Sequence, residues 1–286
     1  MTINIIERPS NNSSDQEIQP KYIILHCIGY SQERALEILT QTVDAGGGGV
    51  SSHYFIPQIE ELASSSAPST YPVYHLVDDT KYAKHAGQSR WLSDSSLNNL
   101  SIGIEFSSPN YANASNEKGG LDWLHFEKFP DSQIHAGIEL LLLLIEHHNI
   151  QPQNILGHSD IAPWRENAAG GLIMGKTDPG GTFPWRELAM NGIGVWPKTQ
   201  RRRSTPIDLS TESIQSLLIE FGYVLDKSGV MDPKTERVIN AFQLHFLPEE
   251  FGNAPSEKMI VFLENLIDKD YEYEPLKRVT EHRMGC

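Results

Sequence analysis

Three residues whose side chains bind metals stand where the backbone must end a strand or become irregular. His158 lies in a stretch rich in glycine and proline, and Asp178 directly precedes a proline. Such a region is incompatible with a continuous helix or strand. His26 ends a short apolar run that predicts a buried strand. Two histidines and one carboxylate are typical protein ligands of a catalytic zinc ion, so these three residues are candidate ligands.

A glutamate inside another apolar segment adds a candidate general base. Glu105 lies in Leu100–Phe106, whose apolar, β-prone residues predict an interior strand. A buried charge is costly unless it is paired or used. Glu105 is therefore either at a strand end facing solvent or a general base whose pKa depends on burial and a nearby cation. Lys176, close to Asp178 in the chain, would supply that cation or stabilise an oxyanion.

Each of these residues, taken alone, has an ordinary structural explanation. A histidine after a buried strand is often a core residue, and an aspartate before proline often forms a turn. The interpretation as a catalytic site depends on their occurrence together in one chain.

Six motifs occur in order along the chain. They are the strand ending in His26, Val50–Ile56, Ala83–Gly87, Leu97–Glu105, Gly157–Pro163 and Lys176–Gly180. Six ordered motifs are far more specific than any one of them. Together they resemble the zinc-dependent N-acetylmuramoyl-L-alanine amidases, a family that includes phage amidases and animal peptidoglycan recognition proteins, and the resemblance covers about residues 20–197.

The resemblance implies a role for each matching residue. It makes His26, His158 and Asp178 the ligands of one Zn²⁺, Glu105 the general base and Lys176 the cation that stabilises the oxyanion. It also places His85 and Asn98 at the substrate groove, whereas His53 is equally consistent with a structural strand histidine. The implied reaction is hydrolysis of the amide bond between N-acetylmuramic acid and L-alanine in peptidoglycan or muropeptides.

Three positions depart from the family pattern. Cys27 follows the first ligand and is predicted to be buried and inert, because neighbouring strand residues point to opposite faces. Lys84 stands where the family usually has tryptophan. The segment Trp164–Gly175 is longer than the usual connection, and we expect it to border the groove as a mobile lid.

The elements that must position these residues predict an α/β fold with a central mixed β-sheet flanked by helices. Strands are predicted over residues 22–28, 52–57, 72–77, 101–107 and 154–157, and helices over 33–42 and 131–148. We expect residues 1–20 to be a flexible leader and residues 21–197 to form the catalytic domain.

The carboxy-terminal part predicts a second, smaller domain. Residues 198–206 are polar, basic and flanked by proline, which indicates a linker. Three helices are predicted within residues 207–270, followed by a tail over 271–286. The segments Ile214–Leu218, Phe221–Tyr223, Ser228–Asp232 and Ala241–Gln243 resemble a three-helix peptidoglycan-binding domain. The combination resembles the AmiD-like branch of envelope amidases, in which a wall-binding domain would raise the local substrate concentration.

Composition restricts the partners. The 37 acidic residues outnumber the 23 basic ones and give a net charge of −14, which argues against nucleic-acid binding. No apolar run approaches the ~18 residues that span a membrane, and the amino-terminal residues lack the apolar core of a secretory signal.

The resemblance favours the periplasm of the cell envelope. The alternatives are a cytoplasmic amidase that recycles anhydro-muropeptides and a non-catalytic recognition protein on the same scaffold. The oligomeric state stays open.

Overall fold

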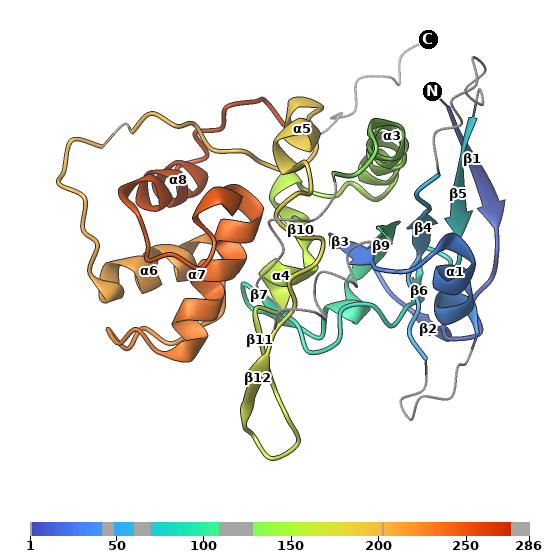
Figure 1. Cartoon of the computed structure of the whole chain (residues 1–286), viewed down its shortest axis with the longest axis horizontal. Helices are drawn as coiled ribbons and strands as arrows, with labels where there is room; N and C mark the ends of the chain where they lie inside the picture. The colour runs from blue at the N-terminus through green and yellow to red at the C-terminus, as the bar shows by residue number, and fades with distance from the viewer. Residues whose placement is uncertain (1, 42–48, 60–69, 109–127, 202, 276–286) are drawn as a thin grey trace, which may run out of the picture.

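The computed structural model describes residues 2–41, 49–59, 70–108, 128–201 and 203–275 (Figure 1). Its centre is a six-stranded mixed sheet with the order β1–β5–β4–β9–β3–β10. In that order the strands are Thr2–Glu7, Thr70–His75, Tyr54–Ile56, Ser101–Ser107, Tyr22–Ile28 and Ile155–Gly157. All neighbouring pairs are parallel except β4 and β5. The predicted class, an α/β fold with a mixed sheet flanked by helices, is confirmed.

The two central strands are buried on both faces, which explains their continuous apolar sequences. On one face, Leu25 and Phe106 pack in a core with the long helix α3 (Asp131–His148). The helix approaches closely because residue 137 is glycine, where a Cβ atom would lie 2.7 Å from the Phe106 ring. On the opposite face, β3 contributes Tyr22 and Ile24 to a core shared with the carboxy-terminal helices.

Smaller elements surround this sheet. Helix α1 (Gln32–Thr40) packs on Phe55 of β4. Three two-stranded sheets pair β2 (Ser14–Glu17) with β6 (Lys81–Tyr82), β7 (Arg90–Trp91) with β8 (Asp94–Ser95), and β11 (Trp164–Glu166) with β12 (Leu172–Met174). The short helices are η1 (Leu97–Asn99), η3 (Pro152–Asn154), α4 (His158–Ile161), α5 (Trp185–Met190) and η4 (Pro248–Glu250).

The amino-terminal segment differs from expectation. In place of a flexible leader over residues 1–20, β1 forms the edge of the main sheet and pairs with β5, and β2 pairs with β6. The alternating apolar residues Ile3 and Ile5 allow this pairing, because one face of an edge strand can remain solvated.

The segment Trp164–Gly175, expected to border the groove as a mobile lid, forms a hairpin, β11–β12, which projects at the bottom of Figure 1. It is fastened to the carboxy-terminal helix α7 (Pro233–Phe246): Lys234 forms an ion pair with Glu166, and the guanidinium of Arg237 donates to the Ile173 carbonyl. Strand β11 leads away from the segment that carries His158, and strand β12 leads back to Lys176 and Asp178.

The carboxy-terminal part contains α6 (Thr211–Phe221), α7 and α8 (Glu257–Ile267), which lie together beside α4 and β10 (Figure 1). Each begins at a side-chain N-cap, namely Ser210, Asp232 and Ser256. The preceding basic segment contacts α8, because Arg201 pairs with Glu264 and Arg203 with Asp268. None of the helices in the described ranges combines the length and hydropathy needed to cross a bilayer.

Candidate active site

The structure brings the three predicted ligands together at the carboxyl ends of β3 and β10. The Nδ1 atoms of His26 and His158 lie 3.0 Å apart, and Asp178 Oδ2 lies 3.2 Å from the first and 3.0 Å from the second. In a tetrahedral zinc site with bonds of about 2.0–2.1 Å, neighbouring ligand atoms are separated by about 3.3 Å. The spacing of these three atoms is therefore close to that of a metal site.

The protonation of this cluster also fits a metal. Burial and the neighbouring His158 lower the pKa of His26 to about 4, so its imidazole is neutral and offers a lone pair. Burial alone would raise the pKa of Asp178, but its interactions with His158 and His26, hydrogen bonds included, outweigh burial and hold that pKa well below its usual range. Neutral imidazoles and an ionised carboxylate are the forms that bind Zn²⁺.

Two backbone hydrogen bonds fix the segments that carry the ligands relative to each other. The backbone N–H of Ser159 donates to the Asp178 carbonyl at 2.9 Å, which joins the two ligand-bearing segments. Lys176 N–H donates to the Ala162 carbonyl at 2.8 Å. Residue 175 must be glycine here, because an added Cβ would lie 2.0 Å from the Pro163 carbonyl oxygen.

Glu105 is the register partner of His26 in the parallel pair of β3 and β9. Paired residues project from the same face of a sheet, so its carboxyl points to the side of the cluster. Its Oε2 is buried, with no hydrogen-bond partner among the described residues. Burial, followed by the charge of Asp178, raises the pKa of Glu105 to about 8, and Lys176 opposes this rise. Such a carboxyl exchanges a proton near neutral pH.

A cavity of about 410 Å³ opens beside the cluster. Its lining includes the three candidate ligands, Glu105 and Lys176, and also His85, Lys84 and Arg165. Arg165 was not singled out from the sequence, although it is the charged residue that directly follows Trp164 at the start of the inserted segment. The cavity is thus bordered by three cationic side chains and one protonatable carboxyl.

The two expected groove residues occupy different places. His85 lines the cavity, and its Nδ1 lies 3.0 Å from Nε2 of His26. Burial, then the neighbouring histidines, lower the pKa of His85 well below its usual range, so His85 is neutral and its Nδ1 can accept from His26. Asn98 is not part of the cavity lining. Its Oδ1 accepts from the backbone N–H groups of His85 and Ala86 at 3.0 and 2.7 Å.

Two further residues, His53 and Cys27, have the burial and contacts of residues that stabilise the fold. His53 is fully buried, accepts at Nδ1 from the Gly103 N–H and contacts the Lys81 carbonyl through Nε2, as a structural strand histidine would. Cys27 is buried, and burial raises the pKa of its thiol well above the usual value, which keeps it in the unreactive thiol form.

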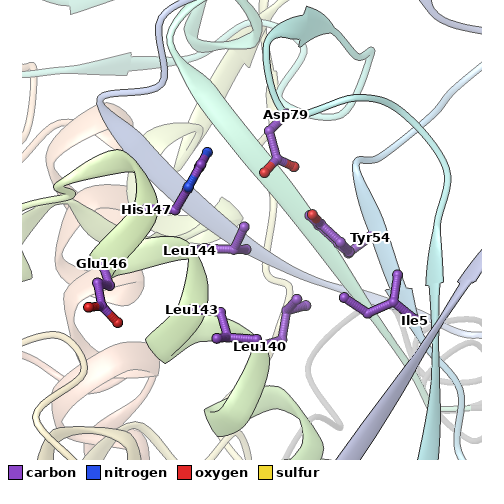
Figure 2. A pocket seen from close by; sticks show the side chains of 8 residues that line it. All are labelled: Ile5, Tyr54, Asp79, Leu140, Leu143, Leu144, Glu146 and His147. Atoms are coloured by element: carbon purple, nitrogen blue, oxygen red, sulfur yellow. The ribbon is translucent and has the colours of Figure 1, made fainter.

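A second cavity, of about 560 Å³, lies on the α3 side of the sheet (Figure 2). It shares no lining residue with the first cavity. Its residues are Ile5, Tyr54, Asp79, Leu140, Leu143, Leu144, Glu146 and His147. His26 and Glu105 project from the opposite face, so this cavity is separate from the catalytic cluster.

Comparison with known proteins defines the class to which this fold and site belong. Residues 16–181 match the family model described as N-acetylmuramoyl-L-alanine amidase. The chain belongs to this family, whose members hydrolyse the amide bond between N-acetylmuramic acid and L-alanine.

Within the family the chain is of the AmiD type. It is 33% identical, over 258 residues, to N-acetylmuramoyl-L-alanine amidase AmiD of Escherichia coli K12, covering 87% of this chain and 83% of the relative. It is 26% identical to a putative amidase of Rickettsia conorii, covering 78% and 76% of the two chains. The solved E. coli AmiD complex with an anhydro-N-acetylmuramic acid tripeptide superposes with a TM-score of 0.70 at 31% identity, covering 92% and 93%. A Pseudomonas aeruginosa AmpDh3 complex with an anhydromuramic pentapeptide gives 0.68 at 27% identity, covering 90% and 94%.

Proposed function

We propose that this amidase acts with one zinc ion bound by His26, His158 and Asp178. The observation that supports this assignment most strongly is the convergence of three buried ligand atoms, from distant parts of the chain, within 4.8 Å of one another. When bound, zinc supplies a Lewis acid that polarises a carbonyl and lowers the pKa of water. Supporting evidence is the neutral state of His26 and the ionised state of Asp178.

Glu105 and Lys176 then supply the remaining groups for amide hydrolysis. We assign Glu105 as the general base, which takes a proton from the attacking water and returns it to the departing L-alanine nitrogen. Its buried, unpaired Oε2 and its raised pKa suit both steps. Lys176 lines the same cavity and supplies positive charge for the oxyanion that develops on the carbonyl oxygen.

The substrates are muropeptides, including those with a 1,6-anhydro sugar. Both solved relatives are complexes with anhydromuramic peptides. In this chain, Lys84 and Arg165 border the cavity with Lys176, and we propose that they attract the carboxylates of the stem peptide. His85 acts mainly as a partner that orients His26, and Asn98 fixes the loop that carries His85.

We propose two domains, a catalytic domain over residues 21–197 that is extended by the paired strands β1 and β2, and a peptidoglycan-binding domain at 207–270, with action in the cell envelope. The resemblance of the second domain's motifs supports this division, as do three helices with their own N-caps. In the loop before α7, Val230 is 61% exposed and Met231 37%, which provides an apolar surface for a sugar polymer.

In cosedimentation with insoluble peptidoglycan, the double variant Val230→Asp/Met231→Asp should bind less than wild type. Leu143→Asp, at an exposed apolar position on α3, is the matched control. Equal loss in both would contradict wall binding through this loop.

The zinc assignment is tested by metal titration of the apoprotein. We expect one Zn²⁺ per chain, no stoichiometric binding in His158→Ala, and full binding in His147→Ala, which changes an exposed histidine outside the cluster. Amidase activity should vanish with a chelator and return with zinc. Stoichiometric binding that persists in His158→Ala would refute the proposed ligand set.

A further inference from the structure

Asp160, two residues after the ligand His158, has a carboxylate that is only 1% exposed and is held by three donors. Its Oδ2 accepts from the backbone N–H of Gly157 at 2.7 Å and lies 2.8 Å from Nδ1 of His245. Its Oδ1 accepts from the Tyr223 hydroxyl at 2.8 Å. Because a carboxylate only accepts, Nδ1 of His245 carries the proton. A buried carboxylate would be costly without such donors.

Two of the three donors come from the carboxy-terminal part of the chain. Tyr223 follows α6, and His245 lies near the end of α7. The third donor, Gly157, is the N-cap residue of α4, the short helix that His158 begins. Asp160 therefore connects the first turn of α4 to two separate elements of the second domain.

His245 also contacts the segment that follows the third ligand. Its ring stacks on Trp185, with centroids 3.8 Å apart and planes inclined by 20°. Trp185 in turn lies against Gly157, where an added Cβ would be 3.1 Å from the indole. One side chain of α7 thus touches both α4, through Asp160, and the start of α5, which follows Asp178.

The two ligand histidines differ in how their rings are held. Nε2 of His26 has His85 as a partner at 3.0 Å. Nε2 of His158 is buried, with no hydrogen-bond partner in the part of the chain that the structure describes. Ligand histidines usually donate their second N–H to a partner that fixes the ring. The placement of His158 therefore depends on the backbone of α4 instead, and hence on Asp160.

We propose that Asp160, Tyr223 and His245 are positioning residues for the metal centre, so that the carboxy-terminal domain contributes directly to the geometry of the active site. The inference rests on the proposed function, in which His158 is a zinc ligand. Without the two donors from the second domain, α4 relaxes and His158 no longer meets His26 and Asp178 at bonding distance. A purely structural role would instead lower stability and leave the metal site unchanged.

The test uses the full chain and the variants Tyr223→Phe and His245→Phe, each of which retains an aromatic ring and removes the donor. Gln243→Leu is the control, since Gln243 is a fully buried residue of the same helix that donates to the Asn253 carbonyl and does not contact Asp160. The readouts are zinc affinity by competition with a chromogenic chelator, the absorption spectrum of the Co²⁺-substituted protein, kcat, KM and Tm.

We expect each donor variant to bind zinc about 10-fold more weakly, within the range known for residues that support metal ligands. The Co²⁺ bands should shift, and kcat should fall with little change in KM. Gln243→Leu should lower Tm only. Wild-type zinc affinity and Co²⁺ spectrum in Tyr223→Phe, which loses a single oxygen atom, would overturn the inference. Failure of the proposed function gives a different result from failure of this inference. If His158 is not a zinc ligand, His158→Ala will bind zinc as tightly as wild type.

Discussion

At the scale of single residues, the site combines a carboxylate that must stay ionised, Asp178, with a carboxyl that must exchange a proton, Glu105. A zinc site needs neutral imidazoles and an ionised carboxylate, and burial together with close approach makes His26 neutral and Asp178 ionised. On the neighbouring strand, Oε2 of Glu105 has no hydrogen-bond partner among the described residues, and burial raises the pKa of Glu105 to about 8. Carboxyl groups with such different surroundings can divide the work, one as a ligand and the other as a proton carrier.

Lys176→Ala should lower kcat by about 10²–10³-fold, which is the usual cost of losing one group that stabilises an oxyanion. Zinc affinity should stay near that of wild type, because Lys176 is not a candidate ligand. Steady-state kinetics on a defined muropeptide and metal titration of the same preparation check both statements. A large loss of zinc affinity, together with a wild-type kcat at saturating zinc, would assign Lys176 to the metal site instead.

Sequence reasoning identified the residue types that meet at this site, because metal ligands, a base and a cation have recognisable chemistry. It did not foresee that Asn98 acts through the backbone of His85, or that Asp160 contacts Tyr223 and His245. These contacts join segments that are distant in the chain, and no local pattern reports them.

At the scale of elements, parallel pairing explains why two distant residues share one face. The register sets His26 opposite Glu105, and alternation sends Leu25 and Phe106 to the other face, against α3. The strand over 22–28 and the helix over 131–148 were predicted with the bounds that the structure has, because a continuous apolar run defines the strand and apolar residues at helical spacing define the helix. The edge strand β1 was missed, since its short amphipathic pattern is flanked by polar residues.

Helix α7 depends on its N-cap, where the Asp232 carboxylate accepts from the Thr235 N–H at 2.8 Å. This bond lowers the pKa of Asp232 below its usual 3.8. The cap is thus fully effective above the unfolded pKa and is lost as pH falls through the folded one. Asp232→Ala should cost about 1 kcal/mol at pH 7, and the difference in unfolding free energy should shrink below pH 3.8. Denaturant unfolding across pH 3–7 measures it, and a constant difference would contradict the role of the charge.

At the scale of the whole molecule, the two parts share one hydrophobic core. Tyr22 and Ile24 of β3 belong to the same cluster as Phe242 and Leu263 of the carboxy-terminal helices. Sequence periodicity predicted the three helices but not this contact, because apolar faces of separate helices do not reveal what they cover. The carboxy-terminal helices are therefore packed onto the sheet as well as connected to it through residues 198–206.

Gly222 is a sensitive point of this contact. Its φ of +146° disfavours other residues, and an added Cβ would lie 2.6 Å from the ring of Trp91 in β7. Its carbonyl also accepts from the Leu92 N–H. Gly222→Ala should destabilise the protein by about 1–3 kcal/mol through strain and steric overlap. Thermal unfolding compares it with Gly229→Ala, where φ is also positive but nothing lies within 4 Å of the added Cβ. An equal loss in both variants would show that strain alone, and not packing on Trp91, is responsible.

The most direct test of the whole account is cleavage of a defined muropeptide, followed by mass spectrometry, with wild type and Glu105→Gln. Wild type should release free stem peptide with L-alanine at its amino terminus only when zinc is present. Glu105→Gln should retain zinc and lose about 10²–10⁴-fold in rate, the contribution typical of general acid–base catalysis. Zinc-saturated wild type that binds the muropeptide without cleaving it, or a Glu105→Gln variant with wild-type turnover, would contradict the account.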